Sequence, residues 1–108
     1  MLTLNLTVAD SFLKRLKGLI GVKALLINEA LLIPRCKIIH TFGMKMSIGV
    51  FFIGPQGQVC HVIPHLKPYR MAYYKQAVSV VETSVFKKID AKQWCNAVHQ
   101  AYADFYRT

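Results

Sequence analysis

The segment from Ser47 to Ile53 most limits how this chain can fold, because it is apolar at both odd and even positions. A strand that is covered on one face alternates, whereas a strand that is covered on both faces is apolar throughout. Gly54-Pro55-Gln56-Gly57 follows, with proline at the second turn position and glycine at the fourth. We therefore predict a central strand at 47–53 and an antiparallel partner strand at Gln58–Ile63.

Three further segments have the pattern of strands. Leu2–Val8 alternates apolar and polar residues, and Ala77–Val85 is rich in β-branched residues. Asn28-Glu29 interrupts the apolar run from Leu25 to Ile33, which predicts a turn followed by a short buried strand that ends at Pro34. The segment Pro64–Arg70 is predicted to be a loop.

Two amphipathic segments predict helices. Asp10 or Ser11 caps the first, in which apolar residues recur at helical spacing up to Ile20. Asp90 and Gln93 form a capping box that opens the second, at about 91–106. Its apolar face is predicted to comprise Trp94, Val98, Ala101, Tyr102 and Phe105.

This order of elements predicts an α+β fold with a mostly antiparallel, curved sheet or a small open β-barrel, flanked by the two helices. A chain of 108 residues has the size of a single domain, 1–108. With 54% hydrophobic and 18% charged residues, it has the composition of a folded chain.

The charge is strongly unbalanced, at 14 Lys and Arg against 5 Asp and Glu, or +9 at pH 7. This balance favours an anionic partner such as nucleic acid, phospholipid headgroups or an acidic protein. Lys14, Arg15 and Lys17 share one side of the first predicted helix and are candidate contacts to an anionic surface. A helix that packs its apolar face on its own sheet has the same pattern, and no nucleic-acid motif frames these residues.

The cysteines and the N-terminus indicate the compartment. Cys36, Cys60 and Cys95 are odd in number and lack Cys-x-x-Cys spacing, so we expect reduced thiols. The start of the chain lacks a basic leader and a cleavage site, and the apolar runs are shorter than a membrane span. We therefore expect a cytoplasmic protein without a transmembrane helix.

A series of short motifs along the chain resembles the family catalogued as domain of unknown function 192. The motifs are Arg15-x-x-Gly18-Leu19-Ile20-Gly21, Leu31-Leu32-Ile33-Pro34-x-Cys36, Ile39-His40-Thr41-Phe42-Gly43-Met44, Ile48-x-Val50-x-Phe52, Gly57-x-Val59, Pro68-x-Arg70, and Ala77 with Val81-Glu82. They cover about residues 10–85. The resemblance implies a small bacterial or archaeal protein of compact α+β architecture, with no established reaction or cofactor, and some members lie near genes for surface appendages.

The chain departs from the family pattern at two positions. Gly49 stands where the family usually has an aspartate, and Phe86, four residues after Glu82 of the Val81-Glu82 motif, stands where the family usually has a glycine. The missing aspartate removes the family's best candidate for a general base or a metal-binding carboxylate. Gly49 itself is expected to leave a gap in the strand that a backbone or a ligand could approach.

The candidate ligand-binding residues are Cys36, His40, Thr41, Met44, Arg70 and Glu82. Thiolate, imidazole and thioether groups suit a soft metal ion, but the segment 36–44 has the pattern of extended or turning chain, in which these groups need not converge. Alternation places Glu82 on the same side as Val78 and Val80, towards the core. A buried carboxylate must be paired or protonated, and Arg70 or Lys45 is the expected partner.

Three functional hypotheses follow from these residues. The favoured one is a non-enzymatic module that binds a small molecule or a protein partner around His40, because the motif mixes polar and apolar groups as ligand sites do. The second is a basic adaptor on nucleic acid or membrane. The third is a metal-binding protein or an enzyme that uses Cys36 and His40. No catalytic residue and no cofactor is predicted.

Overall fold

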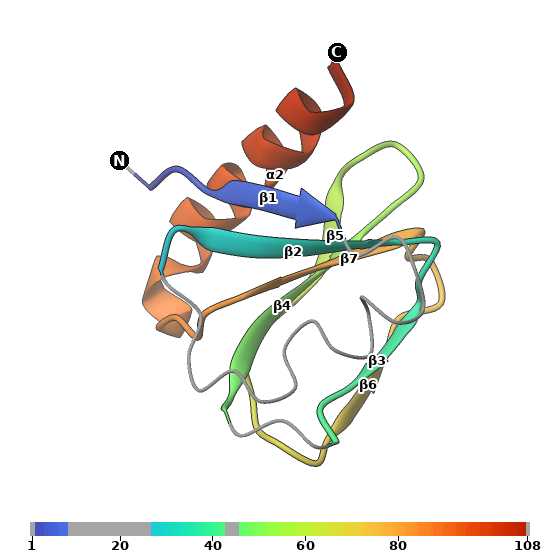
Figure 1. The fold of residues 1–108 in the computed structure, drawn as a ribbon, viewed down its shortest axis with the longest axis vertical. Helices are drawn as coiled ribbons and strands as arrows, with labels where there is room; N and C mark the ends of the chain where they lie inside the picture. The colour runs from blue at the N-terminus through green and yellow to red at the C-terminus, as the bar shows by residue number, and fades with distance from the viewer. Residues whose placement is uncertain (1, 9–26, 43–45, 108) are drawn as a thin grey trace.

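The computed structural model of the protein describes residues 2–8, 27–42 and 46–107 (Figure 1). The helix predicted in the N-terminal half, which carries Lys14, Arg15 and Lys17, lies outside the described residues. Met44 and Lys45 also lie outside them.

The larger of two sheets has five strands: β1 (Asn5–Val8), β2 (Glu29–Pro34), β4 (Ile48–Ile53), β5 (Val59–Leu66) and β7 (Ser79–Thr83). Their order across the sheet is β1-β2-β7-β4-β5. The pair β1–β2 is parallel and the other neighbours are antiparallel. The α+β class is therefore confirmed, and β1 and β5 are the two edges of this sheet, which is open and not closed into a barrel.

Strand β4 is covered on both faces, as predicted, because all of its residues are buried. Val50 and Phe52 belong to one hydrophobic cluster, and Phe51 and Ile53 belong to another on the opposite face. The central strand, however, is β7, which pairs with both β2 and β4. Our placement of 47–53 at the centre was wrong, because apolar residues on both parities indicate coverage of both faces and not a position in the strand order.

Helix α2 (Ala91–Arg107) covers one face of the large sheet. Trp94 and Val98 pack in the cluster of Phe51 and Val81, but Phe105 is exposed. A 3₁₀ helix at Lys88–Asp90 precedes α2, and the Asp90 side chain makes none of the hydrogen bonds of a capping box. No helix among the described residues is long and apolar enough to cross a membrane.

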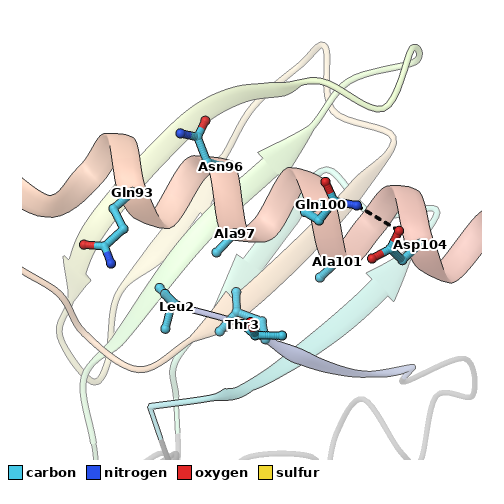
Figure 2. Close-up of a pocket in the computed structure, with 9 residues that line it drawn as sticks. Leu2, Thr3, Gln93, Asn96, Ala97, Gln100, Ala101 and Asp104 are labelled. Atoms are coloured by element: carbon cyan, nitrogen blue, oxygen red, sulfur yellow. Dashed lines mark hydrogen bonds between the residues drawn. The ribbon is translucent and has the colours of Figure 1, made fainter.

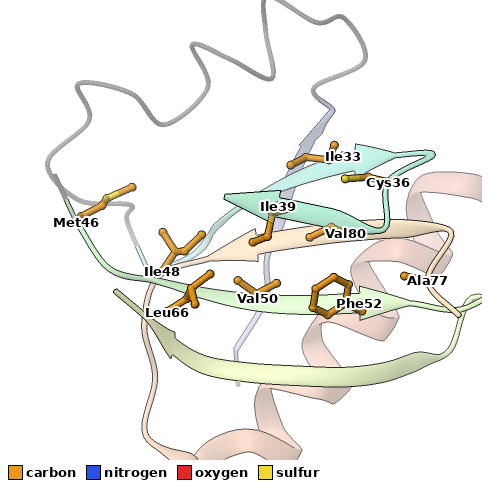
Figure 3. Close-up of a cluster of buried hydrophobic side chains, with 10 residues drawn as sticks. All are labelled: Ile33, Cys36, Ile39, Met46, Ile48, Val50, Phe52, Leu66, Ala77 and Val80. Atoms are coloured by element: carbon orange, nitrogen blue, oxygen red, sulfur yellow. The ribbon is translucent and has the colours of Figure 1, made fainter. Parts of the chain in front are cut away.

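A second, two-stranded sheet covers the opposite face of the large sheet. It consists of β3 (Ile38–His40) and β6 (Met71–Tyr73), which are antiparallel. Ile39 points from β3 into the cluster of Val50, Phe52 and Val80 (Figure 3). We refer to this pair of strands as the small sheet.

The small sheet was not predicted, because each of its strands has only three residues. The segment Pro64–Arg70 was predicted to be a loop. Strand β5 instead continues to Leu66, which pairs with Ile48. The register shifts between Ile48 and Val50, so Pro64 lies at an irregularity where a missing backbone N–H is tolerated. The proline therefore marks a bulge in the strand and not its end.

All three cysteines are free, as their number and spacing predicted. Cys36 is buried, and Cys60 and Cys95 are half-buried. Burial raises the pKa of the Cys60 and Cys95 thiols above the usual value, so both stay protonated at neutral pH. Protonated thiols are weak nucleophiles, which makes these two cysteines poor candidates for covalent catalysis.

Candidate functional site

The side of the small sheet that faces away from the core carries a group of exposed apolar and aromatic side chains. Ile39 and Ala72 point inward, so alternation directs their strand neighbours outward. The pairs Ile38–Tyr73 and His40–Met71 lie opposite each other across the strands. Phe42 lies two residues after His40, and Tyr69 lies two residues before Met71, so these two side chains continue the outward series. These six residues, Ile38, His40, Phe42, Tyr69, Met71 and Tyr73, are called the outer face below.

The aromatic rings of the outer face contact one another. The His40 and Phe42 rings are stacked, with centroids 5.2 Å apart, and the Phe42 and Tyr69 centroids are 6.4 Å apart. Tyr69 and Tyr73 are 66% and 59% exposed, and Phe42 is 46% exposed. Single exposed apolar residues are ordinary, but a contiguous group marks an interaction site.

Thr41 links the two segments of the chain that meet at the end of the small sheet. Its backbone N–H donates to the Arg70 carbonyl (2.8 Å), and its carbonyl accepts from the Tyr69 N–H (3.1 Å). Its buried hydroxyl donates to the Lys67 carbonyl (2.7 Å) and accepts from the Arg70 N–H (2.9 Å). Two residues, Tyr69 and Arg70, thus oppose Thr41, which is the arrangement of a β-bulge.

Tyr69 occupies the left-handed position of this bulge, with a φ of 61°. Glycine is the usual residue there, and a side chain costs about 1–3 kcal/mol in such a conformation. The Thr41 hydrogen bonds hold the loop in place despite this cost. The strain comes from the Cβ atom, and the Tyr69 ring beyond it is exposed, so burial in the core does not explain why a tyrosine stands here.

Removing the Thr41 hydroxyl should loosen this end of the small sheet. We expect Thr41→Val to lower the free energy of unfolding by about 2 kcal/mol, because the Lys67 carbonyl and the Arg70 N–H both lose a partner. Urea unfolding of Thr41→Val and of the exposed control Thr7→Val measures the difference. Equal stability of the two variants would contradict the role assigned to Thr41.

Basic residues flank both ends of the outer face, and acidic residues are absent from this part of the sequence. Residues 30–81 contain no Asp or Glu. Lys67 and Arg70 lie at the Thr41 end, and at the other end the Lys37 ammonium donates to the carbonyls of Ala77 (2.6 Å) and Lys75 (3.0 Å). Of the acidic residues that the structure describes, Glu29 stands at the start of β2, Asp90 and Asp104 lie on the helix side, and Glu82 is buried.

The structure brings together three of the predicted site residues. His40 and Arg70 are exposed beside the buried Thr41. Cys36 lies instead in the hydrophobic cluster beneath the small sheet, where its thiol donates to the Ile38 carbonyl (3.0 Å). Glu82 lies on β7 of the large sheet. The candidates that the structure describes therefore occupy different environments, and among these only the group around Thr41 faces solvent.

Glu82 points to the same face of β7 as Val80, as predicted, and is buried between Leu31 and Val50 on the neighbouring strands. Burial raises the pKa of its carboxyl group from 4.5 to about 7. Among the described residues it has no hydrogen-bond or ion-pair partner. Arg70, one expected partner, donates instead to the Tyr69 carbonyl (3.3 Å).

The metal hypothesis relied on Cys36, His40 and Met44. Cys36 is buried, whereas His40 is exposed and stacks on Phe42. Within residues 2–8, 27–42 and 46–107, no three His, Cys, Asp or Glu side chains are close enough to hold a metal ion. The described part of the chain thus does not assemble the ligand set that the spacing suggested.

The gap expected at Gly49 is filled. A Cβ atom there would lie 2.6 Å from the Thr83 hydroxyl and 2.8 Å from both the Phe86 ring and the Ser84 carbonyl. The Phe86 ring stacks on Phe51 (5.3 Å) and on Trp94 (4.9 Å). The two departures from the family pattern are therefore in contact, and no ligand can approach the strand at this point.

A groove of 390 Å³ lies elsewhere, between the N-terminal segment and α2 (Figure 2). Its lining consists of Leu2, Thr3, Leu4, Gln93, Asn96, Ala97, Gln100, Ala101 and Asp104. Asp104 is already engaged by Gln100 (2.9 Å) and Arg107 (3.3 Å). The groove contains none of the predicted site residues, and we consider the outer face the better candidate.

Most residues of the outer face were not predicted from the sequence as site residues. Ile38, Phe42, Tyr69, Met71 and Tyr73 were not among the candidates. A signal was present, because Ile38-x-His40-x-Phe42 and Tyr69-x-Met71-x-Tyr73 both have the two-residue period of a strand. The period could have revealed two short strands, but not that they pair and present their large side chains on one surface.

Comparison with known proteins places this architecture in a family. Residues 1–88 match the family DUF192, described as uncharacterized ACR. A search of the curated proteins finds no match. A protein of unknown function from Novosphingobium aromaticivorans has a similar structure, with a TM-score of 0.69 and 16% identity over 82% of this chain and 67% of that one. A candidate transcription regulator from Sinorhizobium meliloti is similar at a TM-score of 0.68 and 15% identity, over 76% of this chain and 69% of that one. At these identities the likeness concerns the fold alone.

Proposed function

This chain belongs to the DUF192 family, and from its own surface we propose a function for it. We propose that the protein is a non-enzymatic module that binds an anionic partner through the outer face. One observation carries this proposal. The exposed apolar group on the small sheet is flanked by basic residues at both ends, in a stretch of 52 residues, 30–81, without an acidic residue.

The chemistry of the outer face supports binding more than catalysis. General acid–base and nucleophilic catalysis need a reactive group that is oriented by a neighbour. His40 carries the imidazole of the outer face, and its ring is stacked on Phe42 instead of being oriented by a carboxylate. Arg70 and Lys67 supply positive charge but no proton acceptor at neutral pH.

This proposal joins two of the hypotheses drawn from the sequence. The binding module supplies His40, Thr41 and Arg70, and the basic adaptor supplies the charge. Lys67 and Arg70 stand beside the exposed rings, so electrostatic attraction and apolar contact would act on the same partner. We expect the interaction to weaken as salt is added, because exposed charges are screened.

Retention on heparin-agarose tests the proposal. We expect Lys67→Ala/Arg70→Ala to elute at a distinctly lower salt concentration than the natural chain. The matched control is Lys88→Ala/Lys92→Ala on the helix side, because each double variant lowers the net charge from +9 to +7. Binding by general charge alone would shift both variants equally, and that result would contradict a site on the small sheet.

A further inference from the structure

We infer that the anionic partner is a single-stranded nucleic acid, whose bases stack on the rings of the outer face while its phosphates meet the flanking basic residues. This inference rests on the proposed function, because it identifies the partner of the same surface. Proteins that bind single strands combine aromatic stacking platforms with a basic surface that follows the backbone.

The rings supply the first half of this combination. Four of the six outward residues are aromatic or imidazole rings: His40, Phe42, Tyr69 and Tyr73. Outward residues on one strand are about 7 Å apart, since a strand rises about 3.3 Å per residue. His40, Phe42 and Tyr69 are also in ring contact. The result is a continuous surface that can accept a base without regard to sequence, because every base has a π-face.

The side chains of the outer face do not suit a duplex. A two-stranded ribbon can enter the major groove, but it must then present hydrogen-bonding groups such as Arg, Asn or Gln to the base edges. Ile38, Met71 and Tyr73 stand at those outward positions instead. Apolar and aromatic groups contact unpaired bases, which a duplex keeps inside its stack.

The charges supply the second half. Lys67 and Arg70 lie at one end of the outer face, and Lys37 and Lys75 lie at the other. A strand that crosses the rings would therefore meet positive charge as it enters and as it leaves. Every base of a single strand is accompanied by a phosphate, so this partner offers bases to the rings and negative charge to the basic residues. An acidic peptide offers the negative charge but no bases that could stack on the rings.

A substitution at Tyr69 can test the stacking without destabilising the protein. Its left-handed backbone suits glycine better than tyrosine, so Tyr69→Gly should remain as heat-stable as the natural chain or become more so. The same change removes the most exposed ring of the outer face, at 66%. A loss of binding without a loss of stability would then identify the ring as a contact.

Fluorescence anisotropy with a labelled oligonucleotide of mixed sequence measures the binding. We expect the single strand, as DNA or RNA, to bind at least about tenfold more tightly than the same strand annealed to its complement. Tyr69→Gly and Phe42→Leu should each weaken binding at least about fivefold, the low end of the loss of one base stack. Phe105→Leu, which alters a ring on α2 that is 41% exposed against 46% for Phe42, should change little.

The salt dependence gives a separate measure of the phosphates. Each phosphate contact on a single strand contributes about 0.7 to the slope of log K against log salt. Lys67→Ala/Arg70→Ala should therefore reduce the slope by about 1.4, and Tyr69→Gly should leave it unchanged. A slope that falls equally in the Lys88→Ala/Lys92→Ala control would overturn the assignment of these contacts.

The outcomes separate this inference from the proposed function. Equal binding of duplex and single strand, or full binding by Tyr69→Gly and Phe42→Leu, would overturn the inference. Vesicles that contain phosphatidylserine serve as a second probe. If the protein sediments with vesicles through Phe42 and ignores oligonucleotides, the partner is a lipid surface and the inference fails. The proposed function would survive that result, and it would fall only if the heparin result did not depend on Lys67 and Arg70.

Discussion

Restoring the family's aspartate at Gly49 should destabilise this protein by about 3–5 kcal/mol, a large part of the stability of a small domain. A side chain there would overlap the Thr83 hydroxyl, the Phe86 ring and the Ser84 carbonyl, all within 2.8 Å of its Cβ. The aspartate would also bury a charge. Urea unfolding of Gly49→Asp and Gly49→Ala measures the two contributions separately.

Gly54→Ala is the matched control for Gly49→Ala. The three atoms nearest to a Cβ at Gly54 all belong to the exposed Gln58 side chain, the closest at 2.5 Å, and this side chain can move aside at the cost of its hydrogen bond from the Gln56 N–H (2.9 Å). The Thr83 and Ser84 atoms at Gly49 belong to a buried strand and its continuation, and they cannot move as freely. We therefore expect Gly49→Ala to cost clearly more than Gly54→Ala, and equal costs would show that the site is less crowded than the distances indicate.

The cost of Gly49→Asp should also depend on Phe86. Phe86→Gly alone loses the stacking on Phe51 and Trp94, but it removes one of the three groups that crowd position 49. The double variant should then be more stable than the two single changes predict, by at least about 1 kcal/mol of coupling. Strict additivity would mean that the two departures from the family pattern are unrelated.

Replacing Glu82 with glutamine should change how stability depends on pH. The pKa of this carboxyl group is about 7 in the folded protein and near 4.5 when unfolded, so the folded state holds its proton more tightly. Stability is therefore full below about pH 4.5, falls as the pH rises towards 7, and levels off above it. The free energy of unfolding that is lost as the pH rises corresponds to about 3 kcal/mol, and Glu82→Gln should abolish this pH-dependent loss.

Unfolding midpoints at pH 5 and pH 8 test this expectation. Glu82→Gln should be close to the natural chain at pH 5 and distinctly more stable at pH 8. Asp90→Asn removes the same charge from a less buried position and should leave the pH dependence as it is. Parallel pH curves for the natural chain and Glu82→Gln would mean that the carboxylate is stabilised in its charged form.

Several elements of the fold could be predicted because they depend on local properties of the chain. The strands β1, β2, β4 and β7 and the helix α2 lie where periodicity and turn residues indicated, and β5 starts there but runs on to Leu66, beyond the predicted end at Ile63. A buried strand must be apolar where it is covered, and a helix must repeat its apolar residues about every 3.6 positions. The placement of Glu82 beside Val80 followed from the same alternation.

The candidate site could be predicted only in part. His40, Thr41 and Arg70 were identified from their motifs, but the sequence analysis grouped them with Cys36 and Glu82, which the structure places in other surroundings. The spacing of residues along a chain does not show which face of a strand is covered by the rest of the fold and which face meets solvent. Short strands such as β3 and β6 also carry too few residues for their period to stand out.

The sequence by itself determined which segments are apolar on one face or on both, where the chain turns after β4, and that the protein carries an excess of positive charge. Only the tertiary structure decided that β7 is the central strand, that β3 pairs with β6, and that Phe86 fills the space beside Gly49. It also decided the raised pKa of Glu82 and the grouping of exposed rings beside Lys67 and Arg70. The physical reason is that periodicity arises from each residue's own exposure, whereas pairing, crowding and desolvation depend on residues that lie far away along the chain.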